Sequence, residues 1–494
     1  MPTAAETGRL EITGLAADSR KVEPGFLFAA LPGARADGLD FVAEAVKRGA
    51  AAVLAPTAAE TAVRSLLAQT AASAAGAAAA AEAAPIAVIV DSNPRRLLAL
   101  MAARFFGRQP ETICAVTGTN GKTSVVSFLR QIWSHAGRNA ASLGTLGVAS
   151  SGRRTEGSLT TPDPVALHRM LAELAADGVD ALAMEASSHG IDQFRLDGVR
   201  VAAAAFTNLG RDHLDYHRSI EAYLAAKLRL FSALVAPGGS AVIAADDLVS
   251  GRVRSAASAR GLAVFTYGRQ GEQLRLKTVE PIAGGQRLGV DILGAAHRID
   301  LPLVGDFQAM NALAAAGLAL ATGTAVDAVI GGLARLTPVP GRLECVARVN
   351  GAPVYVDYAH TPDALTAVLR ALRPQTTRRL VVVFGCGGDR DAGKRPEMGA
   401  VAKALADRII VTDDNPRGED AAAIRRQIMI ACPEALEIGD RAAAIAAAMA
   451  DLAPGDVLVV AGKGHETGQI VGSRVLPFDD RQVVRAVAGK GAAE

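Results

Sequence analysis

The sequence predicts an α/β protein with largely parallel sheets, divided into three domains. Its 494 residues exceed what one core can hold, since domains usually comprise about 100–200 residues. Apolar runs of strand length alternate with segments of helical periodicity, which is typical of parallel sheets with helical connections. Polar residues gather just beyond several of these runs, where such sheets bind ligands. We place the domains at residues 1–94, 95–340 and 341–494.

The composition excludes several classes of protein. Half of the residues are hydrophobic, 21% are charged and the formal net charge is +2, with the basic residues scattered, so nothing indicates a nucleic-acid or membrane surface. No run of about 18 strongly apolar residues predicts a membrane span. Cys114, Cys345, Cys386 and Cys432 lack C-x-x-C spacing, which favours buried thiols over disulfides or a zinc site. We therefore expect a cytoplasmic protein, and a monomer because no interface pattern is visible.

The chain is organised around the turn Thr117-Gly118-Thr119-Asn120-Gly121-Lys122-Thr123. An apolar run at 113–116 precedes it and helical periodicity follows it, so strand, glycine-rich turn and helix meet at Lys122. Backbone N–H groups at the helix start can surround phosphate oxygens, Lys122 adds positive charge, and the Thr123 hydroxyl can ligate Mg²⁺. Val116 stands where the usual G-x-x-x-x-G-K-[ST] pattern has its first glycine. The flanking periodicity nevertheless favours a nucleotide site over an ordinary turn.

The first domain carries turns that suit a ligand bearing phosphate and hydroxyls. Its expected strands are at 26–31, 51–54 and 86–90, with an alanine-rich tract at 71–84 as helix or loop. Ser19 and Arg20 precede the first of these strands. Ordinary turn chemistry explains such residues equally well.

The central domain places acidic and imidazole groups near the phosphate loop. Expected strands at 179–184 and 201–206 are followed by Glu185 and by the pair Asp212-His213. Carboxylate oxygens suit a nucleotide-bound Mg²⁺, and taken together these residues favour function over capping. Alternation between 274 and 303 predicts antiparallel strands.

Lys227 lies in the apolar stripe of a helix expected at 220–231. Because lysines are almost never buried without a partner, the pattern alone favours snorkelling, with the stem covered and the ammonium in water. The alternative is a buried amine whose pKa is lowered by desolvation. A neutral amine can react with carbon dioxide to give a negatively charged carbamate.

The third domain is again predicted to be a doubly wound α/β unit. Strands expected at 354–356, 380–384, 409–411 and 457–460 each end in a polar loop. Arg390 and Arg417 can pair with a carboxylate, and Glu466 with an ammonium. Four such loops in one domain predict an amino-acid pocket.

Eight motifs follow one another along the chain: TGTNGKT (117–123), MEASSHG (184–190), NLGRDHLDYH (208–217), PGRLE (340–344), DYAHTPDAL (357–365), GCGGDRD (385–391), DDNPR (413–417) and GKGHE (462–466). In this order and spacing they resemble the Mur ligases over nearly the whole chain. The resemblance implies an N-terminal domain that binds the UDP part of the substrate, a central P-loop ATPase domain and a C-terminal Rossmann-like domain that binds the amino acid.

The resemblance also implies the reaction and the residues that serve it. UDP-N-acetylmuramoyl-L-alanyl-D-glutamate would be joined to a diamino acid through an acyl phosphate, with ATP as co-substrate and Mg²⁺ as cofactor. The residues matching the ATP contacts are Gly118, Thr119, Asn120, Gly121, Lys122, Thr123, Asn311, Arg342 and Asp357. Those matching the UDP-substrate contacts are Ser19, Arg20, Thr160, Thr161, Ser187, Gln193 and Arg195. Thr123, Glu185, His213 and a carbamylated Lys227 would serve or orient the metal, and Lys122, Glu185, His213 and Lys227 would be the catalytic residues.

The amino acid is predicted from the D-N-P-R form of one loop, which diaminopimelate-adding members carry. The implied pocket is Arg390, Asp414, Asn415, Pro416, Arg417, Gly462 and Glu466. Meso-diaminopimelate has a second carboxylate that lysine lacks, and a site built to bind it rejects lysine by leaving polar groups unpaired. The alternatives are a lysine-adding ligase, a D-alanyl-D-alanine-adding ligase, a folylpolyglutamate synthase-like ligase and a non-catalytic scaffold. The scaffold is disfavoured because Glu185, His213 and Lys227 are all present.

Overall fold

The computed structural model describes residues 10–33, 36–74, 86–152, 154–155 and 159–491. Two compact units emerge: residues 1–111, 161–180 and 186–200 form the first, and residues 112–160, 181–185 and 201–494 the second. The predicted α/β class is confirmed. Most of the alanine-rich tract, residues 75–84, lies outside the described residues. The domain boundaries at 94 and 340 stay a prediction.

The first unit contains a four-stranded parallel sheet in the order β1-β2-β3-β4. The strands are β1 (Gly14–Ala16), β2 (Phe26–Ala29), β3 (Ala52–Pro56) and β4 (Ala87–Asp91). Residues alternate between two cores along each strand, so both faces of the sheet are covered. The helices of this unit are α2 (Val42–Lys47), α3 (Glu60–Ala74), α4 (Pro94–Phe106), α6 (Pro164–Ala176) and α7 (Ser188–Asp192).

The second unit contains an eleven-stranded sheet in the order β15-β14-β13-β12-β11-β10-β5-β9-β6-β7-β8. The strands are β5 (Thr112–Thr117), β6 (Ala140–Gly144), β7 (Gly147–Ala149), β8 (Arg154–Thr155), β9 (Ala181–Glu185), β10 (Val201–Phe206), β11 (Val235–Ala244), β12 (Ala263–Gly268), β13 (Leu274–Ile282), β14 (Gly285–Ile292) and β15 (Ala295–Leu301). Strands β6, β9, β5, β10, β11 and β12 are parallel. Strands β13 to β15 pair antiparallel with one another, as the alternation predicted.

Helices α5 and α11 supply many of the side chains in the hydrophobic core beside this sheet. Val125, Phe128, Leu129, Ile132 and Trp133 of α5 pack against the almost entirely apolar α11, which explains the strict helical period after the phosphate loop. The helices are α5 (Lys122–His135), α8 (Leu214–His217), α9 (Ile220–Arg229), α10 (Ser250–Ala259), α11 (Asp306–Ala321) and α12 (Val326–Leu333), and a π-helical turn, η5 (Leu230–Leu234), follows α9.

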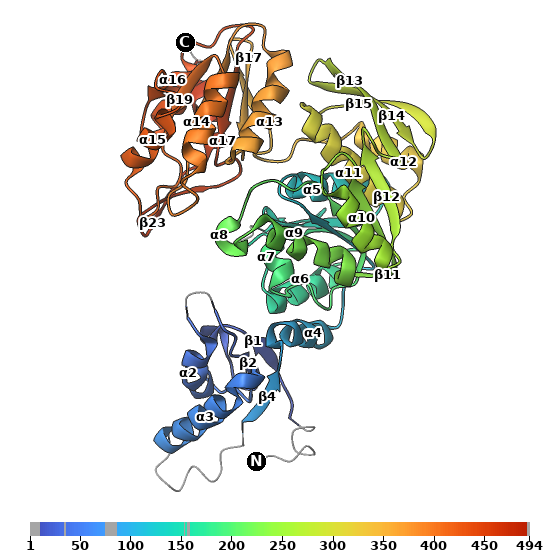
Figure 1. The fold of residues 1–494 in the computed structure, drawn as a ribbon, viewed down its shortest axis with the longest axis vertical. Coiled ribbons are helices and arrows are strands. Elements are labelled where there is room, and N and C mark those ends of the chain that lie inside the picture. Colours follow the sequence, from blue (N-terminus) through green and yellow to red (C-terminus); the bar gives the residue numbers. More distant parts are fainter. Residues whose placement is uncertain (1–9, 34–35, 75–85, 153, 156–158, 492–494) are drawn as a thin grey trace. The chain divides into compact units, whose positions relative to one another are not determined.

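The same unit holds a six-stranded sheet in the order β16-β17-β21-β18-β19-β20, covered by helices on both faces (Figure 1). Only β16 is antiparallel to its neighbour, so the doubly wound prediction is confirmed. The strands are β16 (Glu344–Val349), β17 (Ala352–Asp357), β18 (Leu380–Phe384), β19 (Arg408–Val411), β20 (Leu436–Glu437) and β21 (Val457–Ala461), with a hairpin of β22 (Gly468–Val471) and β23 (Arg474–Pro477). The helices are α13 (Pro362–Leu372), α14 (Lys394–Leu405), α15 (Ala421–Met429), α16 (Arg441–Met449) and α17 (Asp480–Gly491).

Two composition-based predictions have different outcomes. Cys114, Cys386 and Cys432 are buried free thiols as expected, but Cys345 is exposed, because its strand β16 forms the edge of the sheet. None of the helices in the described part of the chain combines the length and apolarity needed to cross a membrane.

Candidate active site

The phosphate loop folds tightly between β5 and α5. Gly121 adopts a positive φ of 89° where the helix begins, a conformation that favours glycine. A Cβ on Gly118 would lie 1.9 Å from Thr207 Oγ1, and one on Gly121 would lie 2.4 Å from Asn311 Oδ1. Both glycines are therefore required by close neighbours, and one of those neighbours, Asn311, is a predicted ATP residue.

The loop is fixed from one side by the residues that follow β10. Asn208 accepts hydrogen bonds from the backbone N–H groups of Thr119 and Asn120, each at 2.9 Å, through its carbonyl and its side chain. Thr207 Oγ1 donates to the carbonyl oxygen of Asn120 at 2.6 Å. No role was predicted for Asn208 from the sequence. Its place two residues after the buried strand β10 was the feature that could have indicated one.

Lys122 lies at the centre of this arrangement. Its Nζ donates to the carbonyl oxygens of Gly118 and Thr119, each at 2.8 Å. Burial lowers the pKa of the ammonium, although the negative charges of Glu185 and Asp212 act to raise it. Two acidic groups thus lie close enough to influence the charge of this lysine.

A cavity of about 380 Å³ opens beside the loop. Its walls combine loop backbone, the ends of β11 and β12, α11 and the start of α13, so it offers both apolar surface and polar groups. Residues that line it include Asn120, Gly121, Asn208, Asp246, Tyr267, Phe307, Met310, Asn311, Arg342, Asp357 and His360. The predicted ATP residues Asn120, Gly121, Asn311, Arg342 and Asp357 therefore line one space.

Arg342 and Asp357 are tied to the loop helix by a short network. Arg342 Nη2 donates to Thr123 Oγ1 at 3.2 Å, and its guanidinium lies 4.3 Å from the ring centroid of Tyr358. Asp357 accepts hydrogen bonds from the N–H groups of Leu343 at 2.6 Å and Ala359 at 2.7 Å. Burial raises the pKa of Asp357 to about 6, against the opposing positive charge of Arg342.

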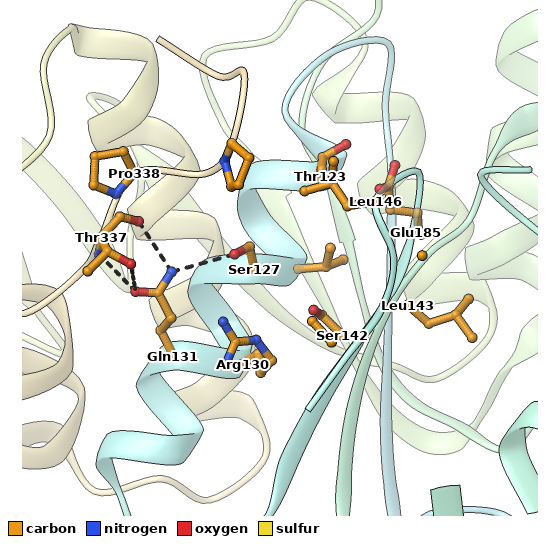
Figure 2. A pocket seen from close by; sticks show the side chains of 15 residues that line it. Thr123, Ser127, Arg130, Gln131, Ser142, Leu143, Leu146, Glu185, Thr337 and Pro338 are labelled. Atoms are coloured by element: carbon orange, nitrogen blue, oxygen red, sulfur yellow. Dashed lines mark hydrogen bonds between the residues drawn. The ribbon is translucent and has the colours of Figure 1, made fainter. Parts of the chain in front are cut away.

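Glu185 and Thr123 line a second cavity, of about 240 Å³ (Figure 2). Glu185 is the last residue of β9 and is only 1% exposed. Its Oε1 accepts from the N–H of Thr145 at 2.8 Å and its Oε2 from the Thr145 hydroxyl at 3.2 Å. A Cβ on Gly144 would lie 2.2 Å from Glu185 Oε1, so a glycine is needed beside this carboxylate.

Thr123 and Glu185 bring a hydroxyl and a carboxylate to one cavity, and both are donors of a kind that Mg²⁺ accepts. Among the described residues, no cluster of three or more His, Cys, Asp or Glu side chains is arranged to hold a metal ion. Mg²⁺ commonly binds through one or two protein groups and takes its other ligands from water and substrate phosphates. The Thr123 hydroxyl and the Glu185 carboxylate meet that requirement.

His213 and Asp212 form a pair on the loop that leads into α8. His213 has a positive φ of 54°, and its Nε2 lies 3.4 Å from Asp212 Oδ2. Burial acts to raise the pKa of Asp212, but His213, His360 and Lys122 together hold it below its usual value. The His213 side chain is 44% exposed, so it lies at the rim of the site.

Lys227 is buried, with 1% of its surface exposed, so the snorkelling prediction was wrong. Its Nζ lies 4.1 Å from the ring centroid of Tyr223, one helical turn earlier. Burial, reinforced by the positive charge of Lys122, lowers the pKa of Lys227 well below its ordinary value. The neighbours of α9 cover the end of the side chain as well as its stem, which periodicity alone cannot reveal.

Tyr223 connects Lys227 to the phosphate loop. Its hydroxyl lies 3.3 Å from Thr119 Oγ1, and its ring centroid is 6.1 Å from that of His213. In the sequence, Tyr223 belongs to the same apolar stripe as Lys227, and no functional role was predicted for it. The signal available was an aromatic residue four positions before a lysine on the same helix face.

The predicted UDP-substrate residues divide into separate groups. In the first unit, Thr161 Oγ1 accepts from the N–H and the hydroxyl of Ser187, both at 3.0 Å. Arg195 donates to the Thr161 carbonyl and to Gln193 Oε1, both at 2.7 Å. Thr160, in the second unit, pairs with Thr145 at 3.0 Å. Ser19 and Arg20 lie on the turn η1 (Ser19–Lys21), bonded to Glu44 and Asp18.

In the third predicted domain, a fully buried lysine organises two loops. Lys463 Nζ donates to Asn415 Oδ1 at 3.1 Å and to Glu466 Oε2 at 2.9 Å. Asn415 Nδ2 also donates to Glu466 Oε2, at 2.9 Å. One carboxylate oxygen of Glu466 therefore receives two donors. Lys463 was not assigned a role from the sequence, although a lysine between two glycines of a strand-end loop was the available signal.

The other residues predicted for the amino-acid site differ in their burial and bonding. Asp414 Oδ2 is buried without a hydrogen-bond partner in the described part of the chain, and a Cβ on Gly462 would lie 2.6 Å from it. Arg417 adopts a positive φ of 51° and donates to the carbonyl of Gly388 at 2.9 Å. Pro416 is buried, whereas Arg390 is exposed.

The glycine-rich loop between strand and helix and the parallel sheets define an α/β protein of the nucleotide-dependent enzyme class. The chain belongs to the Mur ligase family. Three family models match it in order: the Mur ligase family catalytic domain at 11–106, the Mur ligase middle domain at 116–319 and the Mur ligase glutamate ligase domain at 341–464.

Individual relatives resemble the chain from end to end. It is 54% identical over 485 residues to the UDP-N-acetylmuramoyl-L-alanyl-D-glutamate–2,6-diaminopimelate ligase of Mesorhizobium japonicum, covering 98% of this chain and 96% of that protein. The enzyme of the same name from Brucella melitensis is 55% identical over 482 residues, covering 97% and 95%. A solved structure of a ligase with this name is 32% identical, with a TM-score of 0.68 and coverage of 97% and 95%. The MurF ligase from Thermotoga maritima in complex with ADP, 19% identical with a TM-score of 0.64 and coverage of 98% and 99%, shares the fold.

Proposed function

We propose that the protein uses ATP to add meso-diaminopimelate to UDP-N-acetylmuramoyl-L-alanyl-D-glutamate, a step of peptidoglycan precursor synthesis. The observation that carries this proposal is the identity of about half of all residues, over nearly the whole chain, with ligases named for that reaction. The grouping of the ATP-type residues around one cavity supports it. We also infer a monomer that works in the cytoplasm on small-molecule substrates.

The reaction begins with phosphoryl transfer, which depends mainly on positioning and charge neutralisation. The γ-phosphoryl group of ATP passes to the side-chain carboxylate of the substrate glutamate, and ADP leaves. Lys122 and the loop N–H groups hold the β- and γ-phosphates. Arg342, which lies just before β16, contacts the same phosphates. Thr123 and Glu185 would hold Mg²⁺, which would neutralise part of the phosphate charge.

The acyl phosphate is then consumed by the incoming amine. The neutral amino group attacks the acyl carbon, and phosphate departs from the tetrahedral intermediate as the amide forms. The amine loses a proton in this step. A site that excludes water protects the acyl phosphate from hydrolysis.

Lys227 is proposed to act as a carbamate. Burial favours the neutral amine, whose nitrogen attacks the carbon of carbon dioxide; a proton is released and an anionic carbamate remains. With His213 it would serve or orient a second Mg²⁺. Tyr223, in contact with Lys227 and Thr119, would hold this group against the phosphate loop.

The third domain is proposed to select the amino acid. Arg417, with Arg390 at the rim, would bind a carboxylate of diaminopimelate through charge-assisted hydrogen bonds. Glu466, held by Lys463 and Asn415, would bind the distal ammonium. Asp414, Pro416 and Gly462 complete the wall, and Asp414 Oδ2 remains available to a donor of the ligand.

The muramoyl dipeptide is proposed to bind Thr160, Thr161, Ser187, Gln193 and Arg195. The four of these in the first unit are held together by mutual hydrogen bonds. Ser19 and Arg20 are proposed for the uridine nucleotide.

A direct assay tests the proposed function. The purified protein is incubated with ATP, Mg²⁺ and the UDP-linked dipeptide, with either meso-diaminopimelate or lysine, and ADP and the UDP-linked tripeptide are measured. We expect product with diaminopimelate and a much lower kcat/KM with lysine. Comparable efficiency with lysine would overturn the amino-acid assignment, and neither ADP nor tripeptide would overturn the whole proposal.

A further inference from the structure

Gln131, on the third turn of α5, is joined to the segment that leads out of α12. Its Oε1 accepts from the N–H of Thr337 at 2.8 Å and from the Thr337 hydroxyl at 3.0 Å. Its Nε2 donates to the Thr337 carbonyl at 3.3 Å. Figure 2 shows these bonds at the edge of the cavity that Thr123 and Glu185 also line. One side chain thus uses both polar atoms of its amide on a single residue 206 positions away.

The segment that begins at Thr337 returns to the start of the same helix. It ends at Arg342, whose Nη2 donates to Thr123 Oγ1 at 3.2 Å. Thr123 and Gln131 are two steps of four residues apart, so they lie on one helix face about 12 Å apart along the axis. Five residues of chain reach at most about 17 Å, so the segment from Thr337 to Arg342, called the linker below, is long enough to span that distance. The linker runs back along α5 and is held to this helix at both ends.

The linker is stiff between these two points. Pro338 and Pro340 fix two φ angles, and Val339 is fully buried in the core of the large sheet. The N–H of Arg342 donates to the Val339 carbonyl at 3.0 Å. Gly341 has a φ of 67°, and a Cβ there would lie 2.3 Å from the backbone of Gly464. The linker thus has few alternative conformations, so the anchor at Thr337 helps to fix where Arg342 lies.

We propose that Gln131 is a positioning residue for phosphoryl transfer, because it fixes the origin of the linker that carries Arg342 to the phosphate loop. This inference rests on the proposed function, in which Arg342 contacts the ATP phosphates. Gln131 itself touches no substrate; it acts through the placement of the Arg342 guanidinium against Thr123. If the bonds of Gln131 to Thr337 only stabilised a surface turn, replacing Gln131 would change the stability of the protein but not kcat.

The test compares Gln131→Ala with Gln131→Glu and with Ser134→Ala, an exposed control on the same helix. Gln131→Ala should lower kcat for ADP formation by about tenfold or more, since small misplacements near the reacting groups are costly. KM for diaminopimelate should stay within about twofold, because that pocket does not involve α5. Gln131→Glu keeps the acceptor for two of the three bonds with Thr337 and should recover most of kcat. Ser134→Ala should match the parent.

Two further measurements separate positioning from stability and from the proposed function. Hydrogen exchange of residues 336–343 without substrates should speed up in Gln131→Ala, and in the Arg342→Lys background the substitution should cost far less kcat than in the parent. An active parent whose kcat is unchanged by Gln131→Ala, or equal losses in both backgrounds, would overturn the inference alone. A parent that forms no ADP would overturn the proposed function as well, whatever the exchange rates show.

Discussion

Replacing Lys227 by methionine should make the protein more stable and at the same time inactive. Lys227 is only 1% exposed, and the pKa of its amine is lowered because burial penalises the charged form and Lys122 adds a like charge. Methionine has a similar length and carries no group that needs solvation. Replacing this buried polar group should raise the free energy of unfolding by about 1–3 kcal/mol. For the second compact unit that corresponds to a rise of about 1–2 °C in Tm per kcal/mol, because the entropy of unfolding grows with the number of residues.

The stability gained by Lys227→Met should depend on pH. The folded state binds fewer protons than the unfolded state wherever the folded pKa lies below the unfolded value, so the stability contributed by Lys227 rises with pH through that window. The advantage of Lys227→Met is therefore greatest at low pH, where the buried amine is charged, and shrinks as pH rises towards the ordinary lysine pKa. Differential scanning calorimetry at several pH values in buffer free of carbon dioxide measures this trend.

Turnover should change in the opposite direction. We expect Lys227→Met to lower kcat by at least about 10²-fold, the scale of losing one charge-stabilising group at a reaction centre. Lys227→Ala, which leaves room beside Tyr223, should be partly rescued by small carboxylates such as formate. Lys277→Met is the matched control, because Lys277 is half-exposed and pairs with Asp291 at the surface. A Lys227→Met protein that is less stable at every pH and retains activity would refute the reasoning.

Three further predictions follow from contacts in the site. Tyr223→Phe removes the hydroxyl that faces Thr119 and should lower kcat by about tenfold in steady-state assays, the cost of about one hydrogen bond, with little change in Tm; an unchanged kcat would remove Tyr223 from the site. Because burial raises the pKa of Asp357 to about 6, kcat/KM for ATP should fall as pH drops through about 6, since the protonated carboxyl loses a charge-assisted acceptor. Asp357→Asn should abolish that limb of the pH profile, and a limb that persists would assign it to another group. Lys463→Met should raise KM for diaminopimelate by about tenfold or more while KM for ATP stays constant, because Glu466 loses a charged donor; parallel changes in both constants would indicate general unfolding instead.

The sequence predicts the parts of this site that depend on neighbours along the chain. The phosphate loop follows from Gly121 and Lys122 standing between a buried strand and an amphipathic helix, and its geometry agrees. Polar residues follow strands β17, β18, β19 and β21 in the sequence. They were predicted to form a ligand site because parallel sheets bind ligands at the carboxyl ends of their strands. Local spacing carries this information because it sets which residues share a face or an edge.

The remaining features depend on packing between distant segments. Periodicity places Lys227 on the apolar face of α9 but does not say whether its ammonium is also covered. The bonds of Gln131 to Thr337 and of Arg342 to Thr123 join residues 206 and 219 positions apart. Nothing in the local pattern around Gln131 distinguishes it from an ordinary surface glutamine. Such pairings become visible only when the sheets bring the segments together.

Burial shifts the pKa values of Lys227 and Asp357 in opposite directions, and both shifts favour the neutral form of the side chain. It lowers the pKa of Lys227 and raises that of Asp357. A neutral amine is the species that carbon dioxide can modify, and a carboxyl group that ionises near pH 6 responds to charges brought close to it. The desolvation that costs folding free energy is thus the same property that makes these groups responsive. A chain with an apolar residue in place of Lys227 on α9 should therefore fold better, because it lacks the group that we propose to react.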